Sequence, residues 1–293
     1  MDASIETSPA SDVSPSAEIS QRERTLLLLM IGFATLSALP LHQVMLGWML
    51  PLLGMERHAS RASKLAIYAS ATIGRVVILY ATGIAGLRWA KRVGIAPMPL
   101  ANRAELAIRT DEVIAGIKPG LWCALMSVAV AVSQVLVFGY SNHAVSSTAL
   151  ARHQAARTRM EGLISWPSAA YVCAGAPMQE EILFRLFLFS GLAWAMQSLL
   201  KRGNQTRSKV PIWSAIVVSG LVFGLFHVLA GQSVAWWRPT YSQIFLDPRT
   251  YIGMVLAWVY WKRGIETAFI AHSTLNVVVF VPISLLLWVA QPG

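Results

Sequence analysis

Long runs of hydrophobic residues, separated by shorter polar segments, form the main pattern of this chain. The runs cover residues 25–54, 65–87, 120–140, 163–200, 211–231, 251–261 and 267–289. A transmembrane helix needs about 20 predominantly apolar residues. Because most of the runs reach that length, the pattern predicts an all-α fold, a polytopic transmembrane helical bundle of about six to eight spans.

The limits of some spans stay open at this level. Residues 25–54, interrupted by polar positions at 40–43, fit one tilted and kinked span or one span followed by an interfacial segment. Residues 163–200 exceed one straight span, and the Pro residues within them predict that a new helix begins near Pro177. Residues 251–261 are too few to cross a bilayer alone.

The polar segments predict three parts and an orientation. Residues 1–22 have the composition of a disordered tail and lack the basic region of a signal peptide. Residues 23–160 are assigned to N-terminal transmembrane helices, with 88–118 as a basic cytoplasmic loop that holds a short amphipathic helix, and 161–293 to a separate core. Lys and Arg are more numerous in the segments that a cytoplasmic N-terminus places inside, so the positive-inside rule favours that orientation.

Composition supports a multi-pass integral membrane protein, in the cell (inner) membrane if the host is bacterial. The chain is 55% hydrophobic and 13% charged, whereas soluble domains contain about 25% charged residues. The +10 formal charge is dispersed through connecting segments and suits anionic lipid, not nucleic acid, since no basic run is interleaved with aromatic residues. Cys123 and Cys173 lie in apolar runs without C-x-x-C spacing. The oligomeric state is not predictable.

Polar side chains stand inside three of the apolar runs: Glu180, Glu181 and Arg185, then His227, then His272 with Asn276. Each charge at bilayer depth costs at least about 2.5 kcal/mol, so such residues face a protein interior or a water-filled cavity. Glu181 and Arg185 have the i,i+4 spacing of an ion pair. Glu180 lies about 100° around the helix and is not consumed by that pair. One histidine alone is explained by a bond to a neighbouring helix, but three clusters indicate a shared site.

The chemistry that suits this set is hydrolysis. A glutamate beside a histidine can hold and deprotonate a water, and a second histidine with an asparagine amide can donate to the oxyanion of a peptide carbonyl. Glu180, His227 and His272 are also candidate metal ligands, because two imidazoles and a carboxylate can bind Zn²⁺ with one position open. No H-E-x-x-H motif is present. Zinc and no cofactor therefore both stay open.

The motifs, in this order, are Ala176-Pro177-x-x-Glu180-Glu181-x-x-x-Arg185, Phe223-x-x-x-His227 and His272-x-x-x-Asn276. Over about residues 161–290 the chain resembles the CPBP family of intramembrane proteases, which includes CAAX prenyl endopeptidases and bacteriocin-processing or self-immunity proteins. The resemblance implies a helical membrane core around a polar catalytic cavity. It implies an endopeptidase, glutamate- or metal-dependent, that acts on membrane-associated proteins or peptides by CAAX-type or leader-peptide processing.

The same resemblance assigns roles to residues. Glu180 is the expected catalytic base, with His227 helping to hold the water. His272 and Asn276 are the expected oxyanion-stabilising pair, and Glu181 and Arg185 orient the site. The alternative is a non-enzymatic membrane scaffold or immunity protein of the same fold, which would not need an ionised Glu180. A transporter is disfavoured because no internal repeat is visible. The substrate stays open.

Overall fold

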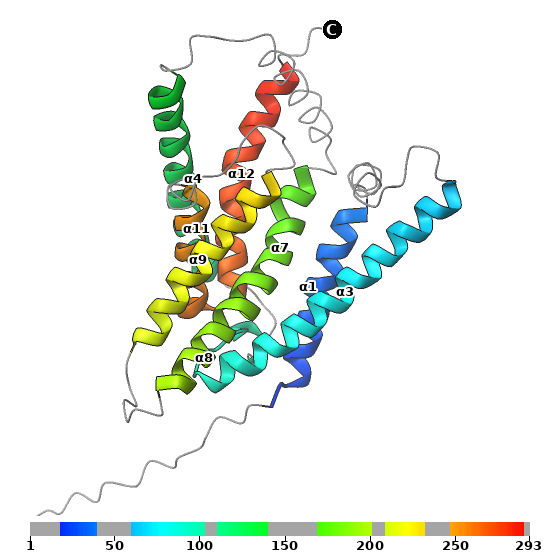
Figure 1. Cartoon of the computed structure of the whole chain (residues 1–293), viewed down its shortest axis with the longest axis vertical. Coiled ribbons are helices and arrows are strands. Elements are labelled where there is room, and N and C mark those ends of the chain that lie inside the picture. Colours follow the sequence, from blue (N-terminus) through cyan, green and yellow to red (C-terminus); the bar gives the residue numbers. More distant parts are fainter. Residues whose placement is uncertain are drawn as a thin grey trace, which may run out of the picture.

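The structure is a computed structural model. It describes residues 18–39, 60–102, 110–139, 169–200, 209–231 and 247–289. Every regular element within these ranges is helical, and they contain no strand. The all-α prediction is therefore confirmed. Figure 1 shows the helices gathered into one bundle, and the first part of the long helix α3 (Arg61–Arg92) projects from it.

The N-terminal half contributes α1 (Gln21–Ala38), α3 (Arg61–Arg92), the short 3₁₀ helix η2 (Pro99–Asn102) and α4 (Thr110–Gly139). One continuous helical segment follows, made of η3 (Tyr171–Gly175), α7 (Ala176–Glu180), η4 (Glu181–Phe189) and α8 (Ser190–Leu200). The chain ends its described part with α9 (Val210–Gly231), α11 (Pro248–Arg263) and α12 (Ile265–Val289).

Five helices in the described ranges are long and apolar enough to cross a membrane: Ala62–Arg92, Thr110–Ala129, Tyr171–Leu200, Val210–Leu229 and Ile265–Pro282. This makes the protein a multi-pass membrane protein, although the number is below the predicted six to eight. Neither α1 nor α11 is among the five. The region after Ala38 in the run 25–54 lies mostly outside the described residues.

The predicted connection 88–118 is shorter than expected. Helix α3 continues to Arg92, and α4 begins at Thr110, ten residues before the predicted start at Gly120. Asp111 and Glu112 occupy the first turn of α4, where negative charge is favourable. The helix then passes through Pro119 without ending. The polar beginning of α4 falls in the segment predicted to be a loop with a short amphipathic helix, and it is instead the first part of a membrane-spanning helix.

The prediction that a new helix begins near Pro177 is wrong, because the backbone is helical on both sides of it. Gly175, Ala176 and Glu181 all have right-handed helical dihedral angles. Residues Tyr171–Gly175 form a π-helical turn, and the Ala176 N–H donates to the Tyr171 carbonyl five residues earlier. The wider turn places Pro177 where its missing N–H does not interrupt the helix.

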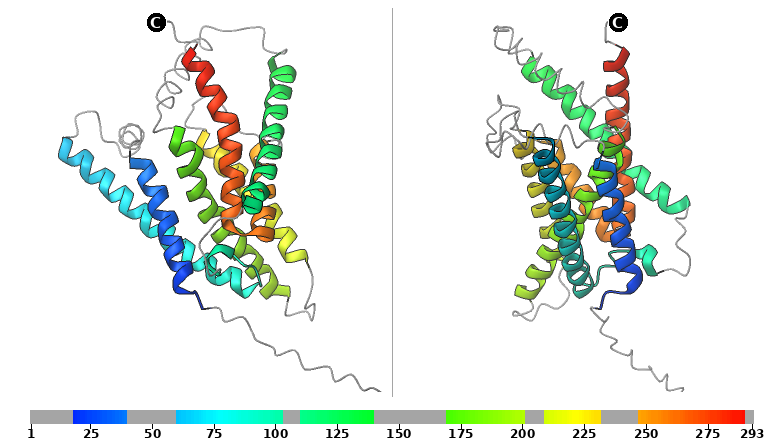
Figure 2. Two further views of the ribbon diagram at one scale, coloured as in Figure 1. Left: turned by 180° about the vertical axis from the view of Figure 1, so that it is seen from behind. Right: turned by 90° about the vertical axis from the view of Figure 1, so that its right-hand side faces the viewer.

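Close helix contacts hold the last three helices together. A Cβ atom on Gly220 or Gly224 of α9 would collide with Thr250 of α11, and one on Gly253 would lie 3.0 Å from Gly220 Cα. Gly220 lies against Met254 and Thr250, whereas Gly224, one turn later on α9, lies against Thr250 alone. The contacts therefore move forward along α9 and backward along α11, so the two helices are antiparallel. Helix α4 lies beside α12 in both views of Figure 2, and its Gly116 and Gly120 face the α12 backbone.

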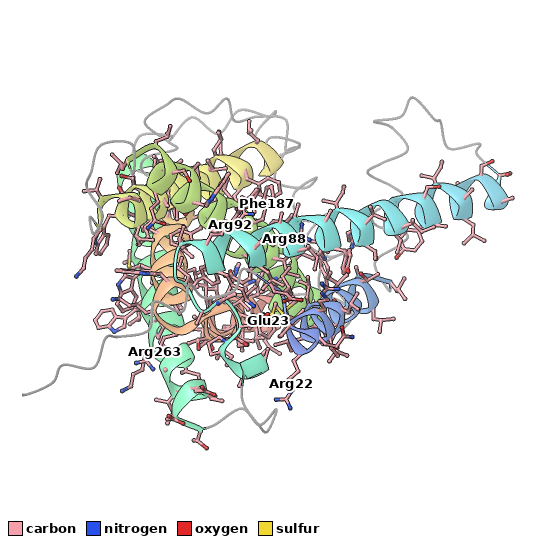
Figure 3. The ribbon with its side chains drawn as sticks, turned by 90° about the horizontal axis from the view of Figure 1, so that it is seen from below. Arg22, Glu23, Arg88, Arg92, Phe187 and Arg263 are labelled. Carbon is pink, nitrogen blue, oxygen red and sulfur yellow. The ribbon has the colours of Figure 1, made fainter. Side chains whose placement is uncertain are left out.

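The first helix is fixed to the end of α3 by a buried ion pair. Glu23 is fully buried, and its Oε2 lies 2.7 Å from Lys91 Nζ. Ser20 and Glu23 also form a capping box at the start of α1. Figure 3 shows Glu23 at the end of the bundle where Arg22, Arg88, Arg92 and Arg263 are also found. This end of the molecule is rich in positive charge.

Candidate active site

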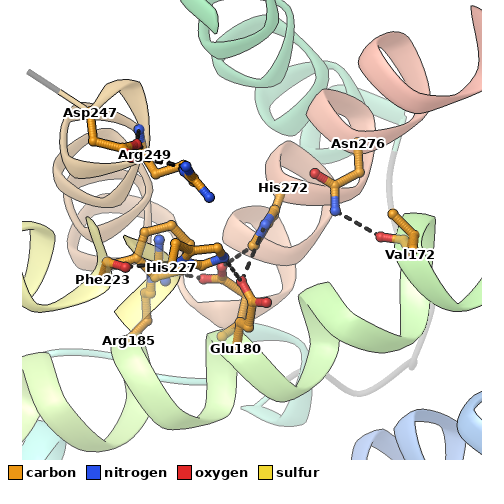
Figure 4. Close-up of polar contacts among 10 residues, drawn as sticks. Val172, Glu180, Arg185, Phe223, His227, Asp247, Arg249, His272 and Asn276 are labelled. Carbon is orange, nitrogen blue, oxygen red and sulfur yellow. Dashed lines mark hydrogen bonds and ion pairs between the residues drawn. The ribbon is translucent and has the colours of Figure 1, made fainter. Parts of the chain in front are cut away.

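Three of the predicted residues meet at one point. Glu180 Oε2 lies 3.6 Å from His227 Nε2 and 3.7 Å from His272 Nε2. The carboxylate comes from α7 and the two imidazoles from α9 and α12 (Figure 4). These distances exceed those of direct hydrogen bonds. Glu180 and His227 remain about one fifth exposed, whereas His272 is buried.

Both imidazoles are held through Nδ1. His227 Nδ1 lies 2.9 Å from the Phe223 carbonyl one turn earlier on α9. A carbonyl only accepts hydrogen bonds, so this nitrogen carries the hydrogen and Nε2 points to Glu180. His272 Nδ1 lies 2.8 Å from Glu181 Oε1. The two adjacent glutamates therefore contact opposite nitrogens of the same ring.

The predicted ion pair between Glu181 and Arg185 is confirmed and completely buried. Arg185 Nε lies 3.3 Å from Glu181 Oε2, with exposures of 1% and 0%. The guanidinium also lies 4.3 Å from the centroid of the Phe223 ring, a distance typical of a cation–π contact. The Phe223 ring is in turn 4.4 Å from the His227 ring and 6.0 Å from the His272 ring. Arg185 thus supports both the second carboxylate and the aromatic wall of the site.

Asn276 has a partner that the sequence did not reveal. Its Nδ2 donates to the Val172 carbonyl at 2.7 Å, which ties α12 to η3 (Figure 4). The Ala176 N–H is bonded to Tyr171, and Pro177, five residues after Val172, has no N–H. Neither residue can therefore supply the backbone donor that the Val172 carbonyl lacks. Asn276 supplies it, since each amide has two N–H groups and one is enough.

The two neighbouring glutamates lie at a junction between helix types. Glu180 is the last residue of α7 and Glu181 the first of the π-helical segment η4. In this wide geometry, the Ser190 hydroxyl donates to the Arg185 carbonyl five residues earlier and also pairs with the Tyr260 hydroxyl. Wide turns of this kind are frequent at functional sites. Spacing alone does not indicate them, because a regular α-helix was the natural assumption.

A second polar pair near the site was also missed. Asp247 caps α11 through the Arg249 N–H, and its two carboxylate oxygens lie 2.9 Å from Nε and Nη2 of Arg249. Asp247 is buried and Arg249 is 42% exposed. The Asp-Pro sequence at 247–248 is a helix-start signal that would have placed these residues at the beginning of α11.

Zinc binding by Glu180, His227 and His272 stays a prediction. Within the described residues, no group of three or more His, Cys, Asp or Glu side chains has the arrangement of a metal-binding cluster. The two imidazole Nε2 atoms both face the single oxygen Oε2 of Glu180. The mechanism proposed below is written with these side chains alone.

Residues 162–278 match a family model, described as type II CAAX prenyl endopeptidase Rce1-like. Over this segment, which is less than half of the chain, the protein is similar to that family. No curated protein and no solved structure matches the chain. The matched segment includes all six predicted site residues and excludes α1, α3 and α4. This agrees with the predicted resemblance, and at the family level it indicates a CAAX-type intramembrane endopeptidase.

Proposed function

We propose that this chain is an endopeptidase that hydrolyses peptide bonds of membrane-associated proteins or peptides, with Glu180 as the catalytic base. The observation that supports this most directly is the meeting of Glu180 Oε2 with two imidazole Nε2 atoms at 3.6 and 3.7 Å. In this proposal one water lies beside Glu180 Oε2 and His227 Nε2, within hydrogen-bonding distance of both. The partial exposure of Glu180 and His227 leaves this point accessible.

In the proposed reaction, the water donates one hydrogen bond to Glu180 and one to the lone pair of His227 Nε2. Glu180 removes a proton as the oxygen attacks the carbonyl carbon of the scissile peptide. The bond to the nitrogen then breaks, and the carboxylic acid of Glu180 returns its proton to the leaving amine. The products are a carboxylic acid and an amine, and transfer of the acid's proton to the amine leaves a carboxylate and an ammonium group.

The proposed oxyanion site consists of His272 and Asn276. This role requires a hydrogen on His272 Nε2, while Nδ1 lies 2.8 Å from Glu181 Oε1 and holds the ring in place. Asn276 would contribute the N–H that is not given to Val172. Preorganised donors of this kind act on charge that develops only in the transition state.

The test is cleavage of a peptide library by detergent-purified wild type, Glu180→Gln and His227→Ala, each with and without a strong chelator. Loss of one acid–base group typically lowers the rate about 10²- to 10⁴-fold. We expect such losses in both variants, with normal membrane insertion and no effect of the chelator. Glu112→Gln, which removes a carboxylate from α4 away from the site, is the control and should cleave at the wild-type rate.

Each other outcome has a definite meaning. Wild-type activity in Glu180→Gln would contradict the base assignment. Activity lost on chelation and restored by zinc would replace the metal-free mechanism with a metalloprotease. Absence of cleavage by the wild type on substrates of every class would favour the non-enzymatic scaffold.

We also propose that the N-terminus is cytoplasmic. The end of the bundle where α1 begins holds many of the described basic residues. Arg22, Arg88, Arg92 and Arg263 are seen there in Figure 3, and the helix ends beside them carry Arg24, Lys91, Lys209 and Lys262. The opposite helix ends hold Arg61, Lys64 and Arg249. An excess of Lys and Arg marks the cytoplasmic side of a membrane protein.

A further inference from the structure

The Arg249 guanidinium, at the beginning of α11, lies at the level of His227 on the neighbouring helix α9. Thr250 of α11 lies against Gly224 of α9, where a Cβ would collide with its hydroxyl. His227 follows Gly224 by one turn, and α9 and α11 run antiparallel, so the residues that begin α11 lie beside His227. In Figure 4 the guanidinium of Arg249 points toward the side of the site where His227 and His272 face Glu180.

Asp247 holds the Arg249 guanidinium in place but bonds to only some of its N–H groups. The edge of the guanidinium formed by Nε and Nη2 bonds to both oxygens of Asp247 at 2.9 Å. A guanidinium carries five N–H groups in a rigid plane, so three remain, two on Nη1 and one on Nη2. They form a second edge that matches the two oxygens of another carboxylate. Arg249 is 42% exposed, so this edge is reachable.

The surroundings favour a peptide with apolar side chains. Phe226 is 47% exposed, and its ring lies 5.5 Å from the His227 ring and 5.3 Å from the Phe184 ring. An exposed aromatic ring beside the catalytic imidazole offers an apolar surface to a substrate side chain. Glu180 is the negatively charged base in the proposed mechanism, so a substrate carboxylate beside it would be repelled without a nearby cation. Arg249 is placed to supply it.

We propose that Arg249, held by Asp247, binds a carboxylate of the peptide substrate and so determines which peptides are cleaved. This proposal rests on the proposed endopeptidase function and adds a specificity residue to it. The carboxylate belongs either to the C-terminus of the substrate, with cleavage close to that end, or to an acidic side chain near the scissile bond. Both have the same chemistry, and the experiment separates them.

The experiment uses three versions of one apolar peptide that the wild-type protein cleaves. One has a free C-terminal carboxylate, one a C-terminal amide, and one a C-terminal amide with a Glu near the scissile bond. For the wild type we expect KM to be about tenfold lower for whichever carboxylate is recognised than for the neutral amide, the effect of one charge-assisted hydrogen-bonded pair. In Arg249→Gln the preference should fall to less than about twofold with kcat retained.

Two further variants separate recognition from structure. Arg249→Lys keeps the charge without the planar fork and should retain part of the preference. Arg263→Gln removes a basic residue from the other end of α11 and should keep the full preference. Equal KM values for acidic and neutral peptides in the wild type would overturn the proposal. So would an Arg249→Gln variant that loses activity equally on all three peptides through a lower kcat, since this indicates a structural role.

A binding measurement keeps the two proposals distinguishable. Fluorescence anisotropy of labelled peptides on the full-length Glu180→Gln protein, with and without Arg249→Gln, needs no cleavage. A preference for acidic peptides that Arg249→Gln abolishes, together with a wild type that cleaves nothing, would support the carboxylate site and reject the endopeptidase. Cleavage without any such binding preference would reject the carboxylate site alone.

Discussion

At the scale of single residues, the site depends on His272 lying between two adjacent carboxylates. Glu181 contacts its Nδ1 at 2.8 Å, and Glu180 faces its Nε2 at 3.7 Å. The sequence predicted that these residues belong together, because polar residues in apolar helices need partners. It did not predict which nitrogen faces which carboxylate, because 91 residues separate His272 from Glu181. That detail depends on how distant helices pack.

The Glu181 and Arg185 pair allows a test of stability apart from catalysis. Glu181→Leu alone leaves a buried guanidinium unpaired and should cost about 3–5 kcal/mol of unfolding free energy. The double change Glu181→Leu with Arg185→Met should recover most of that loss, because apolar residues of similar size replace a buried pair well. Thermal unfolding in detergent measures both. Activity should stay low in each variant, since His272 loses its Nδ1 partner.

Recovered activity in the double variant would show that Glu181 has no orienting role. Failure to recover stability would mean that the pair contributes more than mutual neutralisation, for example through the contact of Arg185 with Phe223.

At the scale of elements, the helix from Tyr171 to Leu200 carries the motif in two π-helical stretches. The sequence predicted its apolar character and its C-terminal end correctly. It failed at Pro177, because proline usually breaks a helix and the π turn that accommodates it has no recognisable sequence signal. Because of the same turn, the Val172 carbonyl accepts its hydrogen bond from the Asn276 side chain.

This coupling predicts the result of a double-mutant cycle. Asn276→Leu should destabilise the protein by about 1 kcal/mol, since it leaves the partly buried Val172 carbonyl without a donor. Pro177→Ala restores an N–H five residues after Val172, so the same Asn276 change should cost less in that background. Unfolding free energies of the four proteins give the coupling. If the two changes in unfolding free energy simply add, the proposed relation between Pro177 and Asn276 is contradicted. If the double variant regains stability but keeps a low kcat, the oxyanion role of Asn276 is supported.

Helix α3 presses directly on the motif helix. A Cβ on Gly86 would collide with the Leu186 carbonyl group and lie 2.9 Å from the Phe187 nitrogen. Gly86→Ala should therefore cost about 1–3 kcal/mol through overpacking, and activity should fall because η4 also carries Glu181 and Arg185. Gly74→Ala on the same helix meets nothing within 4 Å and should gain up to about 1 kcal/mol from helix propensity. Equal unfolding temperatures for the two variants would contradict this contact.

At the scale of the whole molecule, hydrophobic run length predicted most helices well. The runs at 211–231 and 267–289 became α9 (Val210–Gly231) and α12 (Ile265–Val289). The beginning of α4 was missed because its first turns are polar, and periodicity cannot separate a polar helix end from a loop. Convergence of α7, α9 and α12 on one point was inferred from the chemistry of their residues, while the position of α11 beside them was not.

The orientation is testable with single cysteines. In a protein with Cys123 and Cys173 replaced by Ala, a cysteine is introduced at Ala62 or at Ala96, two exposed positions at opposite ends of the bundle. A membrane-impermeant maleimide applied to intact cells should label Ala62→Cys and spare Ala96→Cys. Lysis should make both reactive. The reverse pattern would place the N-terminus outside.

The buried pair between Glu181 and Arg185 also bears on how related protein sequences are classified as active or inactive. An unpaired charge at bilayer depth is costly, so loss of either Glu181 or Arg185 should weaken insertion and folding whatever the protein does afterwards. Under the proposed mechanism Glu180 has a different role, that of the catalytic base. On that proposal, a gene that keeps Glu181 and Arg185 but has lost Glu180 encodes a membrane protein that inserts and folds without hydrolysing peptides. Position 180 is then the residue by which active and inactive relatives should be sorted.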